Sequence, residues 1–176
     1  MRRFFLATIV LATMLSCAGC GNGASNNNLL SIVNKETGTE ISLGEDMAKV
    51  EEKMGSPVFY PKNNVYLYGD SNLPCGSFSA YYDYGTVSCL IFSDTKWETS
   101  SNITVGSSLN ELTENLGNAY LEDEVDGHKV IRYQFTDKLK PVSENKESAY
   151  NILFSINEDN CISGVMIATE EYVQAN

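Results

Sequence analysis

Two segments of this sequence share one pattern of glycines and apolar residues, which we call the repeated phrase. "ISLGEDMAKVEEKMG" spans residues 41–55, and "ITVGSSLNELTENLG" spans residues 103–117. In both copies apolar residues recur at i, i+3 and i+7, which places them on one stripe of an amphipathic helix. Gly55 and Gly117 follow the last apolar residue, where a helix C-cap favours a residue that tolerates positive φ. Each copy therefore predicts a short extended segment, a glycine turn, an amphipathic helix and a glycine stop.

The hydrophobic period changes from 3.6 to 2 after each predicted helix. The first copy continues with "SFSAYYDYGTVSCLIFSD", in which Asp83-Tyr84-Gly85 reads as a hairpin turn. The second continues with "HKVIRYQF" and "YNILFSINEDNCISGVMIAT", and the polar segment 137–149 is the predicted inserted loop. We therefore expect an α+β fold of two tandem repeats, residues 29–98 and 99–176. Each would pack an amphipathic helix on a roughly three- to four-stranded antiparallel sheet.

The N-terminus has the composition of an export signal. Residues 1–19 begin with two arginines, continue with a short apolar run and end in small residues before a cysteine. This pattern resembles the bacterial lipobox, which implies that Cys20 is lipidated; Cys17 is the alternative, and an ordinary secretory signal is the other interpretation. Residues 20–28 would then be the lipidated cysteine and a flexible Gly/Asn/Ser tether. We expect an exported protein, lipid-anchored to the cell membrane and facing the extracytoplasmic side.

The charge of the chain excludes one class of partner. It carries 12 basic and 23 acidic residues, a formal net charge of −11. Such a chain repels phosphate backbones, so we expect no nucleic-acid binding.

The residues that most often carry chemistry are few and scattered. His128 is the only histidine, and no spacing joins it to partners for a metal site or a catalytic triad. Cys75, Cys89 and Cys161 form no CxxC pair; Cys89 reads as a core residue, and a Cys75–Cys89 disulfide remains open. The acids of 121–127 do not keep the spacing of a calcium loop and predict a solvated loop. We expect no catalytic residues, no cofactor and no metal site.

Tyrosine is unusually frequent, with ten residues. Tyr66 and Tyr68 share one face of a strand by their period of 2, and Tyr82 and Tyr84 do so beside the hairpin turn. These side chains either cover the core or form an aromatic binding surface, because tyrosine gives a large contact area at low entropic cost. The four tyrosines are our candidate partner contacts.

The repeated phrase is similar to the small repeat of the β-lactamase-inhibitory protein family. It also resembles the single unit of the outer-membrane-assembly lipoproteins of the SmpA/OmlA type. The resemblance covers the two helical phrases and the strands after them, most of residues 41–172. It implies a protein that binds other proteins and has no catalytic centre. Our expectation is a membrane-anchored cell-surface lipoprotein acting as a non-catalytic protein-binding module; the alternative is an envelope lipoprotein that binds a solute or another ligand.

Overall fold

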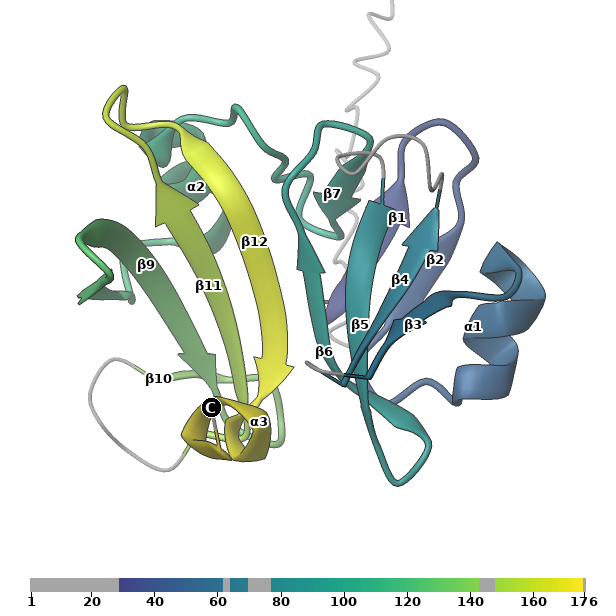
Figure 1. The fold of residues 1–176 in the computed structure, drawn as a ribbon. Coiled ribbons are helices and arrows are strands. Elements are labelled where there is room, and N and C mark those ends of the chain that lie inside the picture. The colour runs from purple at the N-terminus through teal and green to yellow at the C-terminus, as the bar shows by residue number, and fades with distance from the viewer. Residues whose placement is uncertain (1–28, 62–63, 70–76, 143–147, 176) are drawn as a thin grey trace, which may run out of the picture.

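A computed structural model describes residues 29–61, 64–69, 77–142 and 148–175 of the chain (Figure 1). The predicted signal at 1–19, the tether at 20–28 with Cys20, and Cys75 lie outside the described residues.

Most of the described chain forms one large antiparallel sheet (Figure 1). Nine strands take the order β10-β9-β11-β12-β6-β5-β4-β3, with β8 paired on β9. They are β3 (Val58–Tyr60), β4 (Val65–Gly69), β5 (Ser77–Asp83), β6 (Thr86–Phe92), β8 (Leu121–Val125), β9 (His128–Phe135), β10 (Pro141–Val142), β11 (Tyr150–Ile156) and β12 (Ile162–Thr169).

A second, smaller sheet and three short helices complete the described fold. The small sheet has the order β2-β1-β7, formed by β2 (Glu40–Ser42), β1 (Ser31–Asn34) and β7 (Trp97–Thr99). The helices are α1 (Met47–Met54), α2 (Leu109–Leu116) and α3 (Glu170–Ala175). Figure 1 shows α2 and the small sheet behind the large sheet, and α1 beside its β3–β4 end.

The expected fold class, two tandem helix-on-sheet repeats, is wrong. The strands of both expected repeats belong to one nine-stranded sheet, because β6 and β12 pair through Cys89–Phe92 and Val165–Ala168. Pairing these two strands satisfies backbone groups that two separate sheets would have left unpaired at their edges. The helices are also too short to cover a sheet each: α1 buries only Val50, and α2 buries only Leu112. The fold is mostly β.

In both copies of the repeated phrase, the glycine turn is hydrogen-bonded to a strand of the large sheet. Gly44 donates its backbone N–H to the carbonyl of Val87 at 2.8 Å, and Gly106 donates to Ile162 at the same distance. Both acceptors lie near the start of a long strand, β6 in one case and β12 in the other. The repetition therefore specifies where each helix approaches the large sheet.

The two helices end alike but begin differently. Gly55 and Gly117 adopt φ of 79° and 81°, as predicted for their C-cap positions. Ser108 caps α2 in a reciprocal capping box with Glu111, whereas the side chain of Asp46 makes no capping hydrogen bond to α1. The backbone N–H and the hydroxyl of Ser108 both donate to the exposed Glu111 carboxylate, and these two hydrogen bonds lower its pKa.

The core lies on one face of the large sheet, which we call the covered face. The core consists of alternate residues of the large sheet packed with Val50 of α1, Leu112 of α2 and residues of the small sheet. Its largest buried side chains are aromatic: Trp97, Tyr68, Tyr133, Phe78, Phe92 and Phe154. We call the opposite side of the large sheet the open face.

Two predicted loops contain strands. The acidic segment 121–127 contains β8, which pairs with β9 along its whole length, while its Glu122, Glu124 and Asp126 side chains are exposed as predicted. The predicted insertion at 137–149 holds the two-residue strand β10, paired with Phe135 and Gln134. Both segments are polar, so neither carries the apolar alternation by which a strand is usually predicted.

Candidate functional site

The four candidate tyrosines do not form one exposed surface. Tyr68 is 1% exposed and belongs to the core, and its hydroxyl lies 2.7 Å from that of Tyr82. Tyr66 is half-buried against Tyr82, with the rings edge to face at 5.1 Å. Tyr84 stands at the tip of the hairpin and is 99% exposed. Burial raises the pKa of Tyr68, and likewise that of Tyr82.

Tyr68 is therefore not a partner contact, contrary to the prediction. Its ring stacks on Phe78 at 5.1 Å, and Phe78 in turn packs against Trp97 of the small sheet. Tyr66 points to the same covered face, because residues two apart on a strand share a side. The period of 2 correctly groups the two residues but does not reveal which side is buried.

The open face carries a different set of apolar side chains, aligned in a single row. Cross-strand register links one residue from each of eight strands, from β8 at one edge to β3 at the other. In order, the row consists of Leu121, Arg132, Leu153, Met166, Ile91, Ser79, Leu67 and Val58. We call these eight residues the open-face row; six of them are apolar.

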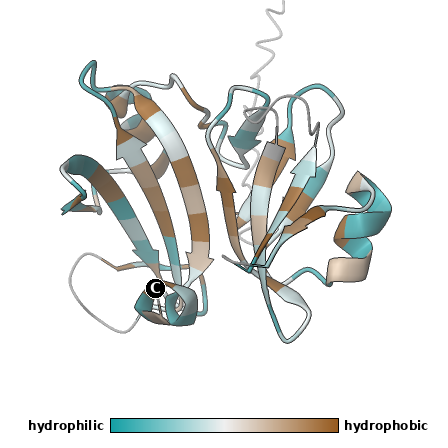
Figure 2. Cartoon of the chain, viewed as in Figure 1, coloured by the Kyte–Doolittle hydropathy of each residue, from teal (hydrophilic) through white to brown (hydrophobic). Residues whose placement is uncertain are grey.

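The position of each row member follows from its neighbours in sequence. Leu153 lies between Ile152 and Phe154, which both belong to the core, so its side chain points to the opposite side. Met166 and Ile91 lie between core residues in the same way, and none of the eight is in the core cluster. Figure 2 shows apolar residues recurring along β6, β11 and β12. The large sheet is thus apolar on both faces along this line.

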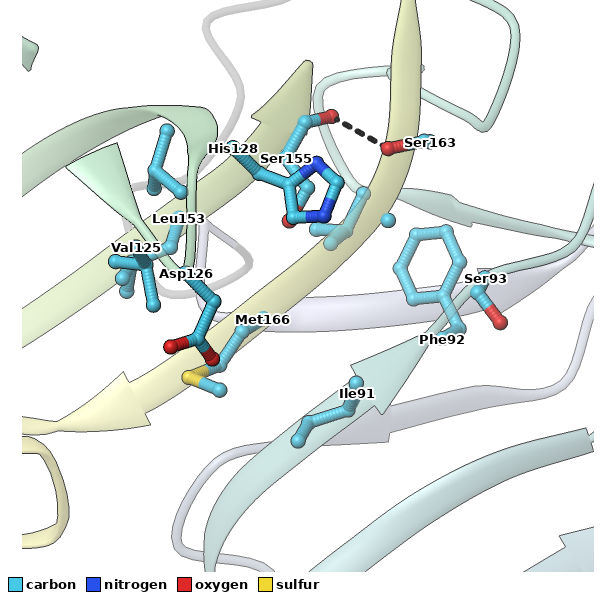
Figure 3. Close-up of a pocket in the computed structure, with 13 residues that line it drawn as sticks. Ile91, Phe92, Ser93, Val125, Asp126, His128, Leu153, Ser155, Ser163 and Met166 are labelled. Carbon is cyan, nitrogen blue, oxygen red and sulfur yellow. Dashed lines mark hydrogen bonds between the residues drawn. The ribbon is translucent and has the colours of Figure 1, made fainter. Parts of the chain in front are cut away.

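A groove lies on the open face where β6 and β12 separate. The two strands pair only as far as Phe92 and Val165, and the next residues on each strand, Ser93 and Gly164, line the groove. Its volume is about 510 Å³. The apolar lining includes three members of the open-face row together with Val130 and Val125 (Figure 3): Ile91, Leu153 and Met166.

The polar lining of the groove is sparse. Asp126 comes from the turn between β8 and β9, His128 is the first residue of β9, and Ser155 and Ser163 come from β11 and β12 (Figure 3). The only hydrogen bond drawn among these residues runs from the Ser163 hydroxyl to the backbone carbonyl of Ser155, at 3.2 Å. In the described part of the chain, no group of three His, Cys, Asp or Glu residues could hold a metal ion. The groove offers apolar contact bordered by an acid and an imidazole.

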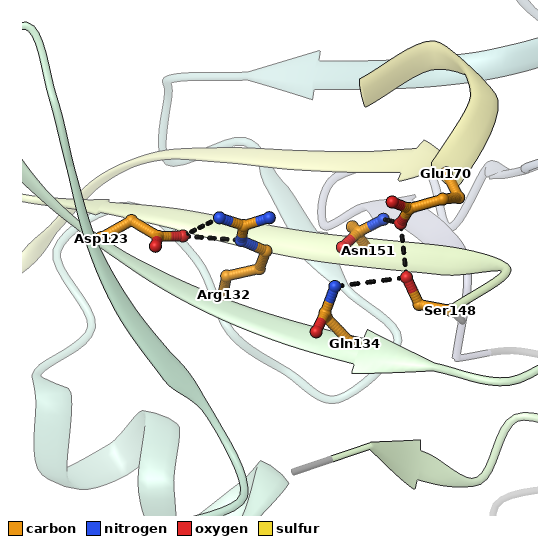
Figure 4. Close-up of polar contacts among 6 residues, drawn as sticks. All are labelled: Asp123, Arg132, Gln134, Ser148, Asn151 and Glu170. Atoms are coloured by element: carbon orange, nitrogen blue, oxygen red, sulfur yellow. Dashed lines mark hydrogen bonds and ion pairs between the residues drawn. The ribbon is translucent and has the colours of Figure 1, made fainter. Parts of the chain in front are cut away.

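The other end of the open face is polar and is covered by α3 (Figure 4). Asn151 donates to a carboxylate oxygen of Glu170 at 2.6 Å, and the Ser148 hydroxyl donates to the same oxygen. Gln134 donates to Ser148 at 3.2 Å. Burial opposes ionisation of Glu170, but the hydrogen bonds from Ser148 and Asn151 outweigh it and lower the pKa of this carboxyl.

An ion pair separates this polar end from the β8 edge. Arg132 donates through Nε to Asp123 at 2.6 Å and through Nη2 to the same oxygen (Figure 4). The pair joins β9 to β8 and neutralises the charged member of the open-face row.

The C-terminal helix also covers the buried thiol of Cys89. Tyr172 of α3 packs against Tyr81 with the ring centroids 5.0 Å apart. Burial raises the pKa of Cys89 to about 12, so this thiol stays protonated at neutral pH. Cys89 is a core-type residue, as predicted, and its suggested disulfide partner Cys75 lies outside the described residues.

Comparison with known proteins finds similar folds but no family. No protein-family model and no curated protein sequence matches this chain. A cysteine-rich secretory protein from Staphylococcus aureus has a similar solved structure, with a TM-score of 0.50, 17% identity, and coverage of 74% of this chain and 46% of that one. An extracellular protein containing an SCP domain from Bacillus anthracis has a TM-score of 0.50 at 8% identity, covering 75% and 45%.

A third solved structure, a DUF4309 family protein from Bacillus subtilis, has a TM-score of 0.47 at 17% identity and covers 70% of this chain and 77% of that one. The chain spans just under half the length of the first two proteins. Since no family model or curated sequence matches, the resemblance to the β-lactamase-inhibitory and assembly lipoproteins rests on the repeated phrase alone. Among the described residues, no helix is long and apolar enough to cross a membrane.

The open-face row was not predicted from the sequence, although a signal for it was present. β11 reads "YNILFSI" and β12 reads "ISGVMIAT", both with apolar residues at consecutive positions. A sheet with one solvated face shows alternation, whereas a strand that is apolar on both sides shows a continuous run. The runs in β11 and β12 therefore indicated a second apolar face.

Proposed function

We propose that this chain is an exported, lipid-anchored protein that acts without catalysis, by binding another protein through the open face of its large sheet. The observation that carries the proposal is the open-face row. Three of its apolar side chains, Leu153, Met166 and Ile91, are adjacent across β11, β12 and β6, and apolar patches left open on a domain mark interaction sites.

Export and anchoring are supported by the N-terminal sequence. An arginine pair, an apolar run and small residues precede Cys20, as in a lipoprotein signal. Two of the solved structures with a similar fold are described as a secretory and an extracellular protein, which agrees with export. Anchoring through Cys20 would hold the open face within reach of proteins at the cell surface.

Lipidation is tested by metabolic labelling with an alkyne analogue of palmitate. We expect label on the wild-type protein and on Cys17→Ser, and none on Cys20→Ser. Label that persists in Cys20→Ser and disappears in Cys17→Ser would assign the anchor to Cys17. The absence of label from all three proteins would refute anchoring.

Binding through the open face is tested by photo-crosslinking in intact cells. A benzoylphenylalanine residue replaces Met166 in one variant and Glu36 in the control, where Glu36 is an exposed residue of the turn after β1. We expect a discrete protein adduct from position 166 and none from position 36. Identical patterns at the two positions, or no adduct at either, would contradict the proposal.

A second function is favoured by the groove. Its volume of about 510 Å³ and its apolar lining fall in the range of small-molecule sites. An envelope lipoprotein that binds a small apolar ligand would retain that ligand through purification. Native mass spectrometry of the purified full chain distinguishes the two functions, because a bound small molecule adds a discrete mass without a crosslinked protein.

A further inference from the structure

The groove on the open face has walls of two kinds. Its floor is apolar, formed by Ile91, Leu153 and Met166 of the open-face row. Its mouth lies at the β8–β9 turn, where Val125 is 52% exposed and Asp126 is exposed. An occupant that suits this groove places apolar groups on the floor and a polar or charged group at the mouth.

The charge at the mouth is negative. Asp126 lines the groove, and the lining contains no lysine or arginine. An adjoining concavity shares His128 and Ser163 with the groove and adds Glu158 from the turn between β11 and β12, together with Lys129, which is paired with Glu122. The acidic side chains around the opening therefore come from two turns that are distant in sequence.

The nearby cations are already paired. Lys129 lies 3.0 Å from Glu122, and Arg132 pairs with Asp123. Asp126 and Glu158 make no ion pair with any residue that the structure describes. The mouth of the groove thus keeps negative charge that the chain itself does not neutralise, which favours a cationic partner.

We infer that the groove binds a short segment of a partner protein that carries apolar side chains beside a lysine or arginine. This inference rests on the proposed function and adds the chemistry of the partner. A second copy of this chain does not suit the site, since each copy has a formal net charge of −11 and would bring more acid to the mouth. An anionic lipid headgroup is disfavoured for the same reason.

Three short peptides test the inference against the purified full chain. The first has leucine at alternate positions and lysine at both ends. The second keeps the leucines and has glutamate at both ends, and the third keeps the lysines and has threonine in place of leucine. Binding is measured by isothermal titration at low and at high salt.

We expect the lysine–leucine peptide to bind at least about tenfold more tightly than either of the others at low salt. Its advantage over the glutamate peptide should shrink in high salt, where the Debye length falls to a few ångströms. Asp126→Asn should weaken binding of the lysine–leucine peptide about two- to fivefold, the range of an exposed charge pair.

Two variants test whether the peptide binds at the groove. Gly164→Val adds side-chain atoms in the lining, at a residue whose added Cβ would meet only ordinary contacts near 3.9 Å, so the fold should tolerate it. We expect it to weaken binding of the lysine–leucine peptide about tenfold or more. Thr37→Val, at an exposed residue of the turn after β1 that lies outside both the open-face row and the groove lining, should leave peptide binding unchanged.

The outcomes distinguish this inference from the proposed function. Equal binding of the lysine and glutamate peptides would overturn the charge requirement, and equal binding of the threonine peptide would overturn the apolar one. Insensitivity to Gly164→Val would place the binding elsewhere. If no peptide discriminates while position 166 still crosslinks to a protein, the inference fails and the proposed function stands. If the crosslink also fails, both fail.

Discussion

Both faces of the large sheet carry apolar side chains, but those of the covered face are buried in the core. On the covered face, Phe154 is fully buried and contacts Tyr133 edge to face at 6.1 Å. On the open face, its neighbour Leu153 is half-buried in a groove of about 510 Å³. Burial of apolar surface within the fold contributes to stability, whereas apolar surface left open contributes only when something binds it. The difference separates residues that maintain the fold from residues that are available to a partner.

The largest expected effect on stability comes from truncating each of these two neighbours on β11 to alanine. Phe154→Ala removes a fully buried ring and should lower the free energy of unfolding by about 3 to 5 kcal/mol. Leu153→Ala should lower it by about 1 kcal/mol or less, because a half-buried side chain loses less apolar contact. Urea unfolding followed by far-UV circular dichroism measures both.

Binding should rank the two variants in the opposite order. Leu153→Ala is expected to reduce crosslinking from position 166, whereas any Phe154→Ala protein that remains folded should crosslink normally. A loss of several kcal/mol from Leu153→Ala would mean that the open face is part of the core, and the comparison would fail.

The next effect concerns the helices that cover the core. Ser108 caps α2 through a capping box, and Asp46 provides no equivalent bond for α1. Ser108→Ala should therefore cost about 1 kcal/mol of unfolding free energy, and Asp46→Ala less than about 0.5 kcal/mol. Thermal unfolding of the two variants, each compared with wild type, measures the difference; equal losses would show that the cap has no role in stability.

A pH effect is expected at the end of the open face that α3 covers. The folded-state pKa of Glu170 is lowered by the hydrogen bonds from Ser148 and Asn151. Its contribution is therefore fully present above the ordinary value of 4.5, and it is lost as the pH falls through the lowered folded-state pKa. Glu170→Gln keeps an acceptor oxygen but does not titrate, so its melting temperature should fall less than that of wild type on acidification below pH 4.5. Equal falls in melting temperature on acidification in the two proteins would show that Glu170 does not contribute to the pH dependence of stability.

The local features of the fold were predictable from sequence, and the non-local ones were not. Gly55 and Gly117 ended their helices as predicted, because a C-cap depends on the backbone conformation of one residue. The turn at Asp83-Tyr84-Gly85 was also predicted correctly, since its signal lies within three residues. The pairing of β6 with β12 joins segments far apart in the chain, and nothing local specifies it.

Tyr68 was assigned to a binding surface for a related reason, although it is buried. The period of 2 assigned Tyr66 and Tyr68 to one face but could not tell the covered face from the open one, because either face of this sheet is apolar. Only the cross-strand register reveals that Leu153 and Met166 belong to the same row as Leu67. A site built from one residue per strand is invisible in a linear sequence.

The smallest expected effect is a gain in stability at a residue that belongs to neither face. Tyr84 lies at the hairpin tip with φ of 47°, followed by Gly85 with φ of 83°. A turn with positive φ at both central residues favours Asn-Gly, and a tyrosine in the left-handed region is strained. Tyr84→Asn should therefore raise the free energy of unfolding by about 0.5 to 1 kcal/mol, measured by urea unfolding.

Tyr84→Phe is the matched control, because it keeps the ring and the backbone strain and should leave stability unchanged. A ring that is 99% exposed makes almost no contact with the fold, so it offers no packing to offset the backbone strain. Reduced crosslinking to the partner in Tyr84→Asn, together with increased stability, would identify a residue kept for binding at a cost in stability. If Tyr84→Asn instead destabilises the protein, the ring contributes to the fold, and the separation between folding and binding residues breaks down at this turn.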